Sequence, residues 1–220
     1  MRLIFIGPPG SGKGTQAKLL GKRQGLLHFA TGDVLRQAIE KDTPEGRLAK
    51  PYITAGRLVP DDVVNQIVSA RFRSPDRPEH FVLDGYPRTL TQAFAFDGLL
   101  KDIGLDLTSV VFLQVDDDEI VRRLSDRWTC PALTCQATFQ TNSKPPRVPG
   151  KCDVCQMPLH QRDDDKPETI RARLRVFHDL HDGILKHYAA QNRVVEVPGR
   201  GDIETIYENI LRGLRQKVSA

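Results

Sequence analysis

The 220-residue sequence has no long apolar segment. No apolar run approaches the roughly 18 residues that a membrane-spanning helix requires. The first residues carry one arginine and a short apolar run, which is too short for a secretory signal peptide. We therefore expect a cytoplasmic protein for which a membrane is not a partner.

A strong excess of one charge is also missing. The 32 basic and 28 acidic side chains leave a formal net charge of +4. This mild excess argues against nucleic acid as a partner and favours arginines gathered around a smaller anionic ligand. A guanine-reading N-K-x-D motif is absent too, since no asparagine is followed by lysine. That absence argues against a guanine nucleotide switch.

What the sequence does contain is a Gly-rich loop at residues 7–15, G-P-P-G-S-G-K-G-T, directly after the apolar run at 3–6. Glycines allow successive backbone N–H groups to face one concavity, and the next helix directs its positive end there. Lys13 adds a point charge for the outer phosphates. The spacing fits G-x4-G-K, but Gly14 follows the lysine and the hydroxyl comes at Thr15. The loop predicts binding of a nucleoside polyphosphate.

The fold class follows from runs of apolar, β-favouring residues separated by helical patterns. These runs show little alternation, which is typical of parallel strands buried on both faces. We therefore predict an α/β protein with a P-loop parallel sheet flanked by helices, whose ligands lie at the carboxyl ends of the strands. The runs lie at residues 3–6, 81–83, 110–115 and 194–197, with a further candidate at 26–29.

Two segments interrupt this alternation and read as inserts. The first contains short helical patterns, and the second is rich in proline, threonine and cysteine. Helical patterns return at 168–190 and 203–214. The predicted division is a core domain of residues 1–29, 60–126 and 164–220, a small helical insert at 30–59, and a four-cysteine insert at 127–163.

The turn Asp84-Gly85-Tyr86-Pro87-Arg88 follows the predicted strand at 81–83. A carboxylate at the end of a buried strand beside a phosphate loop is well placed to hold Mg2+, directly or through water. Arginine is the side chain best suited to phosphoryl oxygens, because its planar fork binds them bidentately. Several arginines are candidates if they converge on one cleft: Arg36, Arg88, Arg123, Arg127, Arg162 and Arg173.

Together these motifs resemble the adenylate kinase family. The resemblance rests on the loop at 7–15, T-G-D at 31–33, A-G-x-L-V at 55–59, D-G-Y-P-R-T at 84–89 with Gln92, and R-D-D-D at 162–165. It covers essentially the whole chain and matches the long form with a full lid. It implies that the insert at 30–59 binds the nucleoside monophosphate (NMP) and that 127–163 is the lid. G-K-G-T is that family's own form of the loop.

The resemblance also implies site residues. The ATP-binding set would be Gly10, Ser11, Gly12, Lys13, Gly14, Thr15, Arg123, Arg127, Thr138, Phe139 and Gly201. The AMP-binding set would be Thr31, Arg36, Arg57, Leu58, Val59, Gly85, Tyr86, Pro87, Arg88, Gln92, Arg162 and Arg173. The groups that stabilise the transferring phosphoryl would be Lys13, Arg88, Arg127, Arg162 and Arg173. Asp84 would bind Mg2+ through water, and Asp164 and Asp165 would act in lid closure.

The chain has four cysteines, Cys130, Cys135, Cys152 and Cys155. Two close pairs of thiolates suit tetrahedral Zn2+, and with four protein ligands the metal would be structural. The first pair is C-x4-C, longer than the usual C-x2-C, which leaves room for weaker binding or another metal such as iron. Reduced free thiols are the alternative.

The predicted activity is reversible, Mg-dependent phosphoryl transfer from ATP to AMP, giving two ADP, by a monomeric enzyme. The acceptor assignment rests on few atoms, those of Thr31 and Gln92. Another nucleoside monophosphate kinase, with UMP or CMP as acceptor or GTP as donor, is therefore the nearest alternative.

Overall fold

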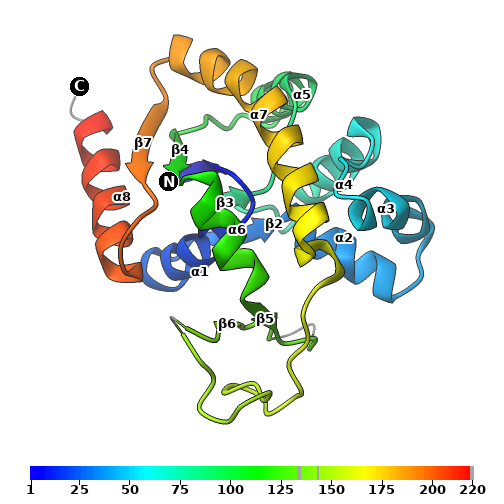
Figure 1. The fold of residues 1–220 in the computed structure, drawn as a ribbon. Helices are drawn as coiled ribbons and strands as arrows, with labels where there is room; N and C mark the ends of the chain where they lie inside the picture. Colours follow the sequence, from blue (N-terminus) through cyan, green and yellow to red (C-terminus); the bar gives the residue numbers. More distant parts are fainter. Residues whose placement is uncertain (133–134, 143, 219–220) are drawn as a thin grey trace.

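A five-stranded parallel sheet lies at the centre of the protein, with helices on both faces (Figure 1). The computed structural model describes residues 1–132, 135–142 and 144–218. The strand order is β2-β3-β1-β4-β7, so the strand before the phosphate loop is the middle one. The strands are β1 (Arg2–Ile6), β2 (Leu27–Ala30), β3 (Phe81–Asp84), β4 (Ser109–Gln114) and β7 (Val194–Pro198).

The two faces of the sheet are both apolar, as the lack of alternation predicts. Along β1, Leu3 and Phe5 belong to one buried cluster, whereas Ile4 and Ile6 belong to another. Successive side chains of a strand point to opposite faces. A strand covered by helices on both sides therefore needs apolar residues at every position. The predicted fold class is confirmed.

Each face is covered by its own helices. The cluster on the Leu3 face is completed by α1 and α8, and the one on the Ile4 face by α4, α5 and α7. A smaller cluster joins α6 to the first turns of α7. These helices are α1 (Lys13–Gln24), α4 (Asp61–Arg73), α5 (Leu90–Asp102), α6 (Asp117–Ser125), α7 (Pro167–Ala190) and α8 (Ile203–Val218). None of the described helices is long and apolar enough to cross a membrane.

Two segments project from this core (Figure 1). One consists of α2 (Thr31–Glu40) and α3 (Pro44–Thr54). Thr43 precedes α3, and its side chain accepts a hydrogen bond from Gly46 N at 3.2 Å, which fixes where that helix begins. The other contains the antiparallel pair β5 (Arg127–Thr129) and β6 (Thr138–Gln140). Its small buried cluster consists of Cys130, Phe139, Cys152 and Leu159.

The sheet register brings the motif-bearing loops to one edge. β3 lies between β1 and β2, with Asp84 opposite Phe5 on one side and opposite Ala30 on the other. Because all five strands are parallel, the segments after β1, β2 and β3 leave from the same edge of the sheet. The loop at 7–12, helix α2 and the turn at 85–88 therefore meet there, where doubly wound sheets bind ligands.

Candidate active site

The loop between β1 and α1 curls back on itself and leaves the start of the helix open. Ser11 N donates to Pro8 O at 3.1 Å, which closes a tight turn. Gly12 precedes α1 with φ +97, a left-handed conformation that favours glycine. No side chain caps the helix, and its first turn contains no acidic residue. The first N–H groups of α1 are therefore free of side-chain caps and suited to bind an anion.

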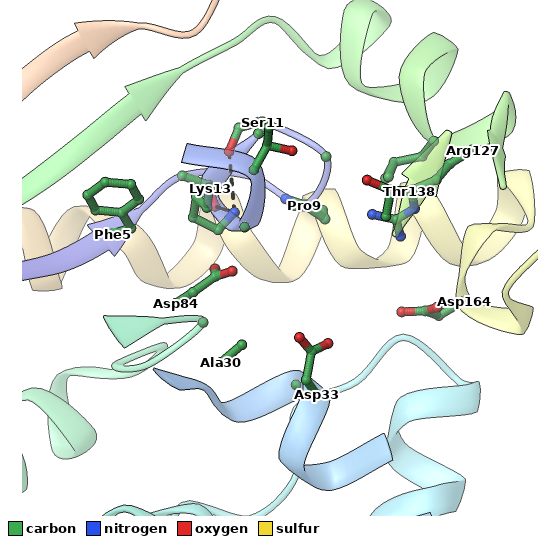
Figure 2. A pocket seen from close by; sticks show the side chains of 18 of the residues that line it. Phe5, Pro9, Ser11, Lys13, Ala30, Asp33, Asp84, Arg127, Thr138 and Asp164 are labelled. Atoms are coloured by element: carbon green, nitrogen blue, oxygen red, sulfur yellow. Dashed lines mark hydrogen bonds between the residues drawn. The ribbon is translucent and has the colours of Figure 1, made fainter. Parts of the chain in front are cut away.

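Lys13 lies folded into this loop. Its Nζ donates to the carbonyl oxygens of Gly7 and Pro8, both at 2.7 Å. It also donates to Ser11 Oγ at 3.3 Å, the bond drawn as a dashed line in Figure 2. Burial lowers the pKa of Lys13 to about 8; the positive charge of Arg88 acts in the same direction, against the charge of Asp84. An incoming phosphate would restore a counter-charge to this lysine, because opposite charges nearby favour the charged form.

Asp84 ends β3 directly beside the loop, and Figure 2 shows its carboxylate facing the same space as Lys13. Its Oδ2 lies 3.6 Å from Nε2 of His28 on the neighbouring strand β2. Burial raises the pKa of Asp84, but the interactions with His28 and Lys13 lower it by a larger amount. The pKa of Asp84 is therefore below its ordinary value. The carboxylate therefore stays ionised and fits a hard cation such as Mg2+, which prefers oxygen ligands.

Three arginines meet two carboxylates where the cysteine-bearing segment joins the core. Arg127 donates to both carboxylate oxygens of Asp165, at 2.8 and 2.6 Å. Arg162 binds Asp164 in the same bidentate way, at 2.8 and 2.5 Å. Arg173 Nη1 lies 3.0 Å from Asp164 Oδ2 and 3.5 Å from Asp165 Oδ1. The convergence that the sequence could not establish is therefore present for these three.

The charged groups of this cluster shift one another's pKa values. Burial lowers the pKa of Arg173 to about 10; neighbouring Arg162 and Arg127 also lower it, against the charge of Asp164. Burial likewise opposes ionisation of Asp164, but the charges of Arg162 and Arg173 outweigh it and hold its pKa far below the ordinary value. Three cations held against two anions leave an excess positive charge that an anionic ligand would satisfy.

A second part of the site is built from α2 and the turn after β3. Thr31 Oγ1 donates to Gly85 O at 2.8 Å, and Arg88 Nε donates to the same carbonyl oxygen at 2.7 Å. Arg36 forms an ion pair with Asp33, one turn away on α2. Gly85 has φ +78, a left-handed conformation that favours glycine, and a Cβ there would lie 2.8 Å from Arg88 Nη2, so a larger residue would displace the end of the arginine.

On the opposite side, Arg123 of α6 is held by two acceptors. Its Nε donates to Glu119 Oε1 at 2.6 Å, and its Nη2 donates to Gly199 O at 3.0 Å. Gly199 follows β7, so the guanidinium lies next to the segment that contains Gly201. The planar face of a guanidinium fixed in this way is suited to stack on a base.

These groups surround one cavity of about 970 Å³. Figure 2 shows Asp33 opposite Lys13 and Asp84, with Arg127, Thr138 and Asp164 at the far end. Residues lining the cavity include these predicted ones: Gly10, Ser11, Gly12, Lys13, Gly14, Thr15, Thr31, Arg36, Arg57, Leu58, Val59, Asp84, Gly85, Pro87, Arg88, Gln92, Arg123, Arg127, Thr138, Arg162, Asp164, Arg173 and Gly201.

Three predicted residues lie behind this lining. Phe139 is buried in the cluster around Cys130 and Cys152. Tyr86 is 1% exposed, and its hydroxyl donates to Asn65 Oδ1 at 2.7 Å. The Asp165 side chain is fully buried under Arg127. Each therefore packs behind the lining instead of facing the cavity.

The four cysteines gather into one cluster, with their sulfur atoms all within 4.8 Å of one another. Cys130 and Cys155 lie 3.3 Å apart and Cys135 and Cys152 3.6 Å apart, as free thiols. Sulfurs around a tetrahedral zinc, each about 2.3 Å from the ion, lie roughly 3.8 Å apart. Burial raises the pKa of Cys130 to about 12. For Cys152 burial acts in the same direction, but N–H groups of Cys155 and Val154 outweigh it and lower the pKa to about 7. The cluster could hold a metal ion.

Sequence reasoning missed His28 and Asp33, which both line the cavity. His28 lies on the candidate strand at 26–29, and only the pairing of β2 with β3 brings it to Asp84. Asp33 was available from the T-G-D motif, since an aspartate three residues before Arg36 on a helix forms an ion pair with it.

Fold and site together define a class. An uncapped helix start with a partly buried lysine, a strand-end carboxylate and a group of converging arginines describe an α/β phosphotransferase of the P-loop type. A family model described as adenylate kinase matches residues 5–193. The chain belongs to the adenylate kinase family and is a nucleoside monophosphate phosphotransferase, which confirms the family inferred from the motifs.

Individual relatives cover nearly the full length. The chain is 42% identical over 217 residues to the adenylate kinase of Streptomyces avermitilis, spanning 99% of this chain and 98% of that protein. It is 43% identical over 210 residues to that of Archaeoglobus fulgidus, spanning 96% of each chain. With the adenylate kinase of Salinispora tropica the identity is 44% over 215 residues, spanning 98% of each.

Proposed function

We propose that the protein catalyses reversible transfer of a phosphoryl group from Mg-ATP to AMP, giving two ADP. The observation that carries this proposal is the placement of Lys13, Asp84 and the arginine cluster around one cavity of about 970 Å³. This volume is at the upper end of the usual range for ligand cavities, so it has room for two ligands. Family membership supports the same pair of substrates.

The proposed donor site is the phosphate loop with the segment around Arg123. Residues 10–15 would bind the ATP phosphates, and Arg123 would lie over the adenine, with Gly201 offering backbone groups beside it. Thr138 would contact the donor from the lid, and Phe139 would support it from behind. Support comes from the uncapped start of α1 and from the hydrogen bonds that fix Arg123 in place.

The proposed acceptor site lies across the cavity, on α2, the segment 57–59 and the turn at 85–88. Arg36 and Arg88 would bind the AMP phosphate, while Thr31 and Gln92 would contact the base. An amide and a hydroxyl suit this role, because they can pair with the edge of a neutral base. Arg57, Leu58, Val59 and Gln92 all line this side of the cavity.

Catalysis in this proposal is positioning and charge stabilisation. The AMP phosphate oxygen already carries the charge of a nucleophile, so no general base is needed. Lys13, Arg88, Arg127, Arg162 and Arg173 would stabilise the negative charge that spreads over the transferred group. When bound with ATP, Mg2+ neutralises phosphate charge, and Asp84 would hold it, directly or through water.

The proposed division into core, NMP-binding insert and lid has a physical purpose. Water at the γ-phosphate would hydrolyse ATP, so the site should close only over both substrates. Asp164 and Asp165 join the lid segment to α7 and bind its arginines, which supports a role for them in closure. This proposal assigns residues 1–29, 60–126 and 164–220 to the core, residues 30–59 to the NMP-binding insert and residues 127–163 to the lid.

We also propose a structural Zn2+ on Cys130, Cys135, Cys152 and Cys155. The distances between the sulfur atoms support a tetrahedral metal site. Of the four cysteines, Cys130 also lines the cavity, and none has a role in the proposed reaction. Free thiols are usual in a reducing compartment, so a cytoplasmic location fits them. One chain supplies both sides of the cavity, so the proposed enzyme is active as a monomer.

An acceptor and donor panel tests the reaction. Initial rates are measured with AMP, UMP, CMP and GMP against ATP or GTP, with and without chelation of Mg2+. The expected result is a strong preference for AMP with ATP and no turnover without Mg2+. A preference for another acceptor would overturn the acceptor assignment and favour the alternative nucleoside monophosphate kinase.

A further inference from the structure

Asp61 is the first residue of α4, and its side chain links the start of α4 to the start of α5. Its Oδ1 accepts a hydrogen bond from Gln92 Nε2 at 2.7 Å, and its Oδ2 accepts one from Thr89 Oγ1 at 2.7 Å. Thr89 Oγ1 in turn accepts from Gln92 N at 3.1 Å. The carboxylate therefore closes a ring of hydrogen bonds around Gln92, although no motif in the sequence includes Asp61.

The ring fixes which way the Gln92 amide points. Gln92 Oε1 accepts from Arg88 N at 2.7 Å, while Nε2 donates to Asp61. A backbone N–H only donates and an ionised carboxylate only accepts. Turning the amide over would place N–H against N–H and oxygen against oxygen. Because Gln92 is 2% exposed, water could not replace the lost partners cheaply.

Within the part of the chain that the structure describes, one N–H and one oxygen lone pair of the amide have no hydrogen-bond partner, and Gln92 lines the cavity. On its Watson–Crick edge adenine presents an amino donor beside the ring acceptor N1, which is the complement of a carboxamide. On the same edge guanine presents the reverse, the carbonyl acceptor O6 beside the donor N1–H. A base held in one place by its phosphate and ribose is thus accepted or refused according to the orientation of this amide.

We propose that Asp61 is a positioning residue that sets the choice of acceptor base, by holding the Gln92 amide in the orientation that reads adenine and refuses guanine. The inference rests on the proposed function and adds to it the residue that determines base selectivity. Asp61 itself does not line the cavity, so it acts through Gln92.

The test compares AMP with GMP as acceptor in Asp61→Ala and Asp61→Asn. The readout is the ratio of kcat/KM for AMP to kcat/KM for GMP, together with the KM for ATP. Loss of a hydrogen bond to a charged acceptor predicts that Asp61→Ala lowers this ratio about tenfold or more, mainly through KM for AMP. Asp61→Asn keeps one accepting oxygen and is expected to recover part of the ratio. The KM for ATP is expected to stay unchanged in both.

Asp62→Ala is the matched control. Asp62 is the next residue of α4, exposed and also in its first turn, so both substitutions remove a carboxylate that favours the helix start. The control is expected to leave the ratio unchanged. If Asp61→Ala does not fold, as thermal unfolding would show, Asp61→Asn alone carries the test.

Two results would overturn the inference. One is an unchanged ratio in both Asp61 variants, and the other is an equal fall in kcat/KM for AMP and GMP, which a merely structural role produces. Failure of the proposed function is distinguishable, because it would be seen in the unsubstituted protein as no preference for AMP over the other acceptors.

Discussion

The carboxylate of Asp84 lies close to Gly14, in the space that a side chain at position 14 would enter. A Cβ at position 14 would lie 3.1 Å from Asp84 Oδ2, closer than most real contacts of a Cβ. This distance gives a physical reason for the departure from the strict G-K-[ST] pattern in the loop. A serine directly after Lys13 would press on the carboxylate, so the hydroxyl comes one residue later, at Thr15.

Gly14→Ser is therefore expected to lower kcat about tenfold or more and to raise the Mg2+ concentration needed for half-maximal rate, because small displacements at a reacting site cost much activity. Gly14→Ala separates the effect of the Cβ from that of the hydroxyl. Gly183→Ala serves as the control, since a Cβ on this residue of α7 meets nothing within 4 Å. Full activity of both Gly14 variants would contradict the argument.

Lys13→Met is expected to reduce kcat by about 10²–10³, the usual cost of losing one charge-stabilising group at a transition state. Conversion of ADP to ATP and AMP by the purified variant measures it. Lys22→Met, in the last turn of the same helix and exposed, removes an equal charge away from the loop and should leave the rate unchanged. Undiminished turnover by Lys13→Met would refute the proposed mechanism.

The lowered pKa of Lys13 predicts proton uptake on binding. Between pH 8 and about 10 the free protein has partly lost the Lys13 proton, and a bound phosphate favours its return. Calorimetry of ATP binding in buffers of different ionisation enthalpy should show uptake that grows above pH 8. Equal uptake by Lys13→Met would contradict this assignment.

The same shift has a definite sign for stability. In the unfolded chain a lysine titrates near pH 10.4, so between that value and 8 the unfolded state binds more protons than the folded state. The contribution of Lys13 therefore raises the free energy of unfolding as the pH rises through this window. Urea unfolding at several pH values should show a rise that is smaller in Lys13→Met.

Asp164→Ala is expected to destabilise the protein by about 3 kcal/mol, because it removes the buried counter-charge of Arg162 and the nearer of the two carboxylates beside Arg173. Urea unfolding at pH 7 measures the loss. The adjacent Asp163→Ala is the control, since that side chain is 83% exposed and pairs with Lys166 at 3.9 Å. Equal stability of the two variants would show that the arginine cluster does not need Asp164.

The cysteine cluster predicts about one bound zinc per chain in protein purified without chelator. Removing the bound metal, or introducing Cys152→Ser, is expected to lower the melting temperature by about 5 °C or more while leaving measurable activity. Metal analysis by mass spectrometry, with melting curves before and after chelation, tests both parts. Absence of stoichiometric zinc or iron would refute the metal site.

The sequence was sufficient for features that depend on local pattern. The strands of the sheet follow from unbroken apolar runs, and the phosphate loop follows from glycine spacing before a lysine. It was not sufficient for pairs that depend on register. His28 meets Asp84 because β2 lies beside β3, and Asp61 meets Gln92 because α4 and α5 begin close together. Neither contact leaves a periodic signal along the chain.

The same limit explains why Phe139 and Tyr86, predicted as site residues, do not face the cavity. A motif identifies a position, but the side to which its side chain turns is decided by packing in three dimensions. Phe139 fills the cluster around two cysteines, and Tyr86 packs against Phe96 with its hydroxyl bound to Asn65. Both aromatic rings contribute more by burial than they would by facing a water-filled cavity.

The place of β1 in the middle of the strand order has a geometric consequence. The segment of α2 and α3 follows β2 at one side of the sheet, and the segment with Gly199 and Gly201 follows β7 at the other. Four strand spacings of about 4.8 Å separate them, a span of roughly 19 Å. In the proposed function, backbone hydrogen bonding in the sheet thus sets the distance between the two segments that would hold the two nucleosides.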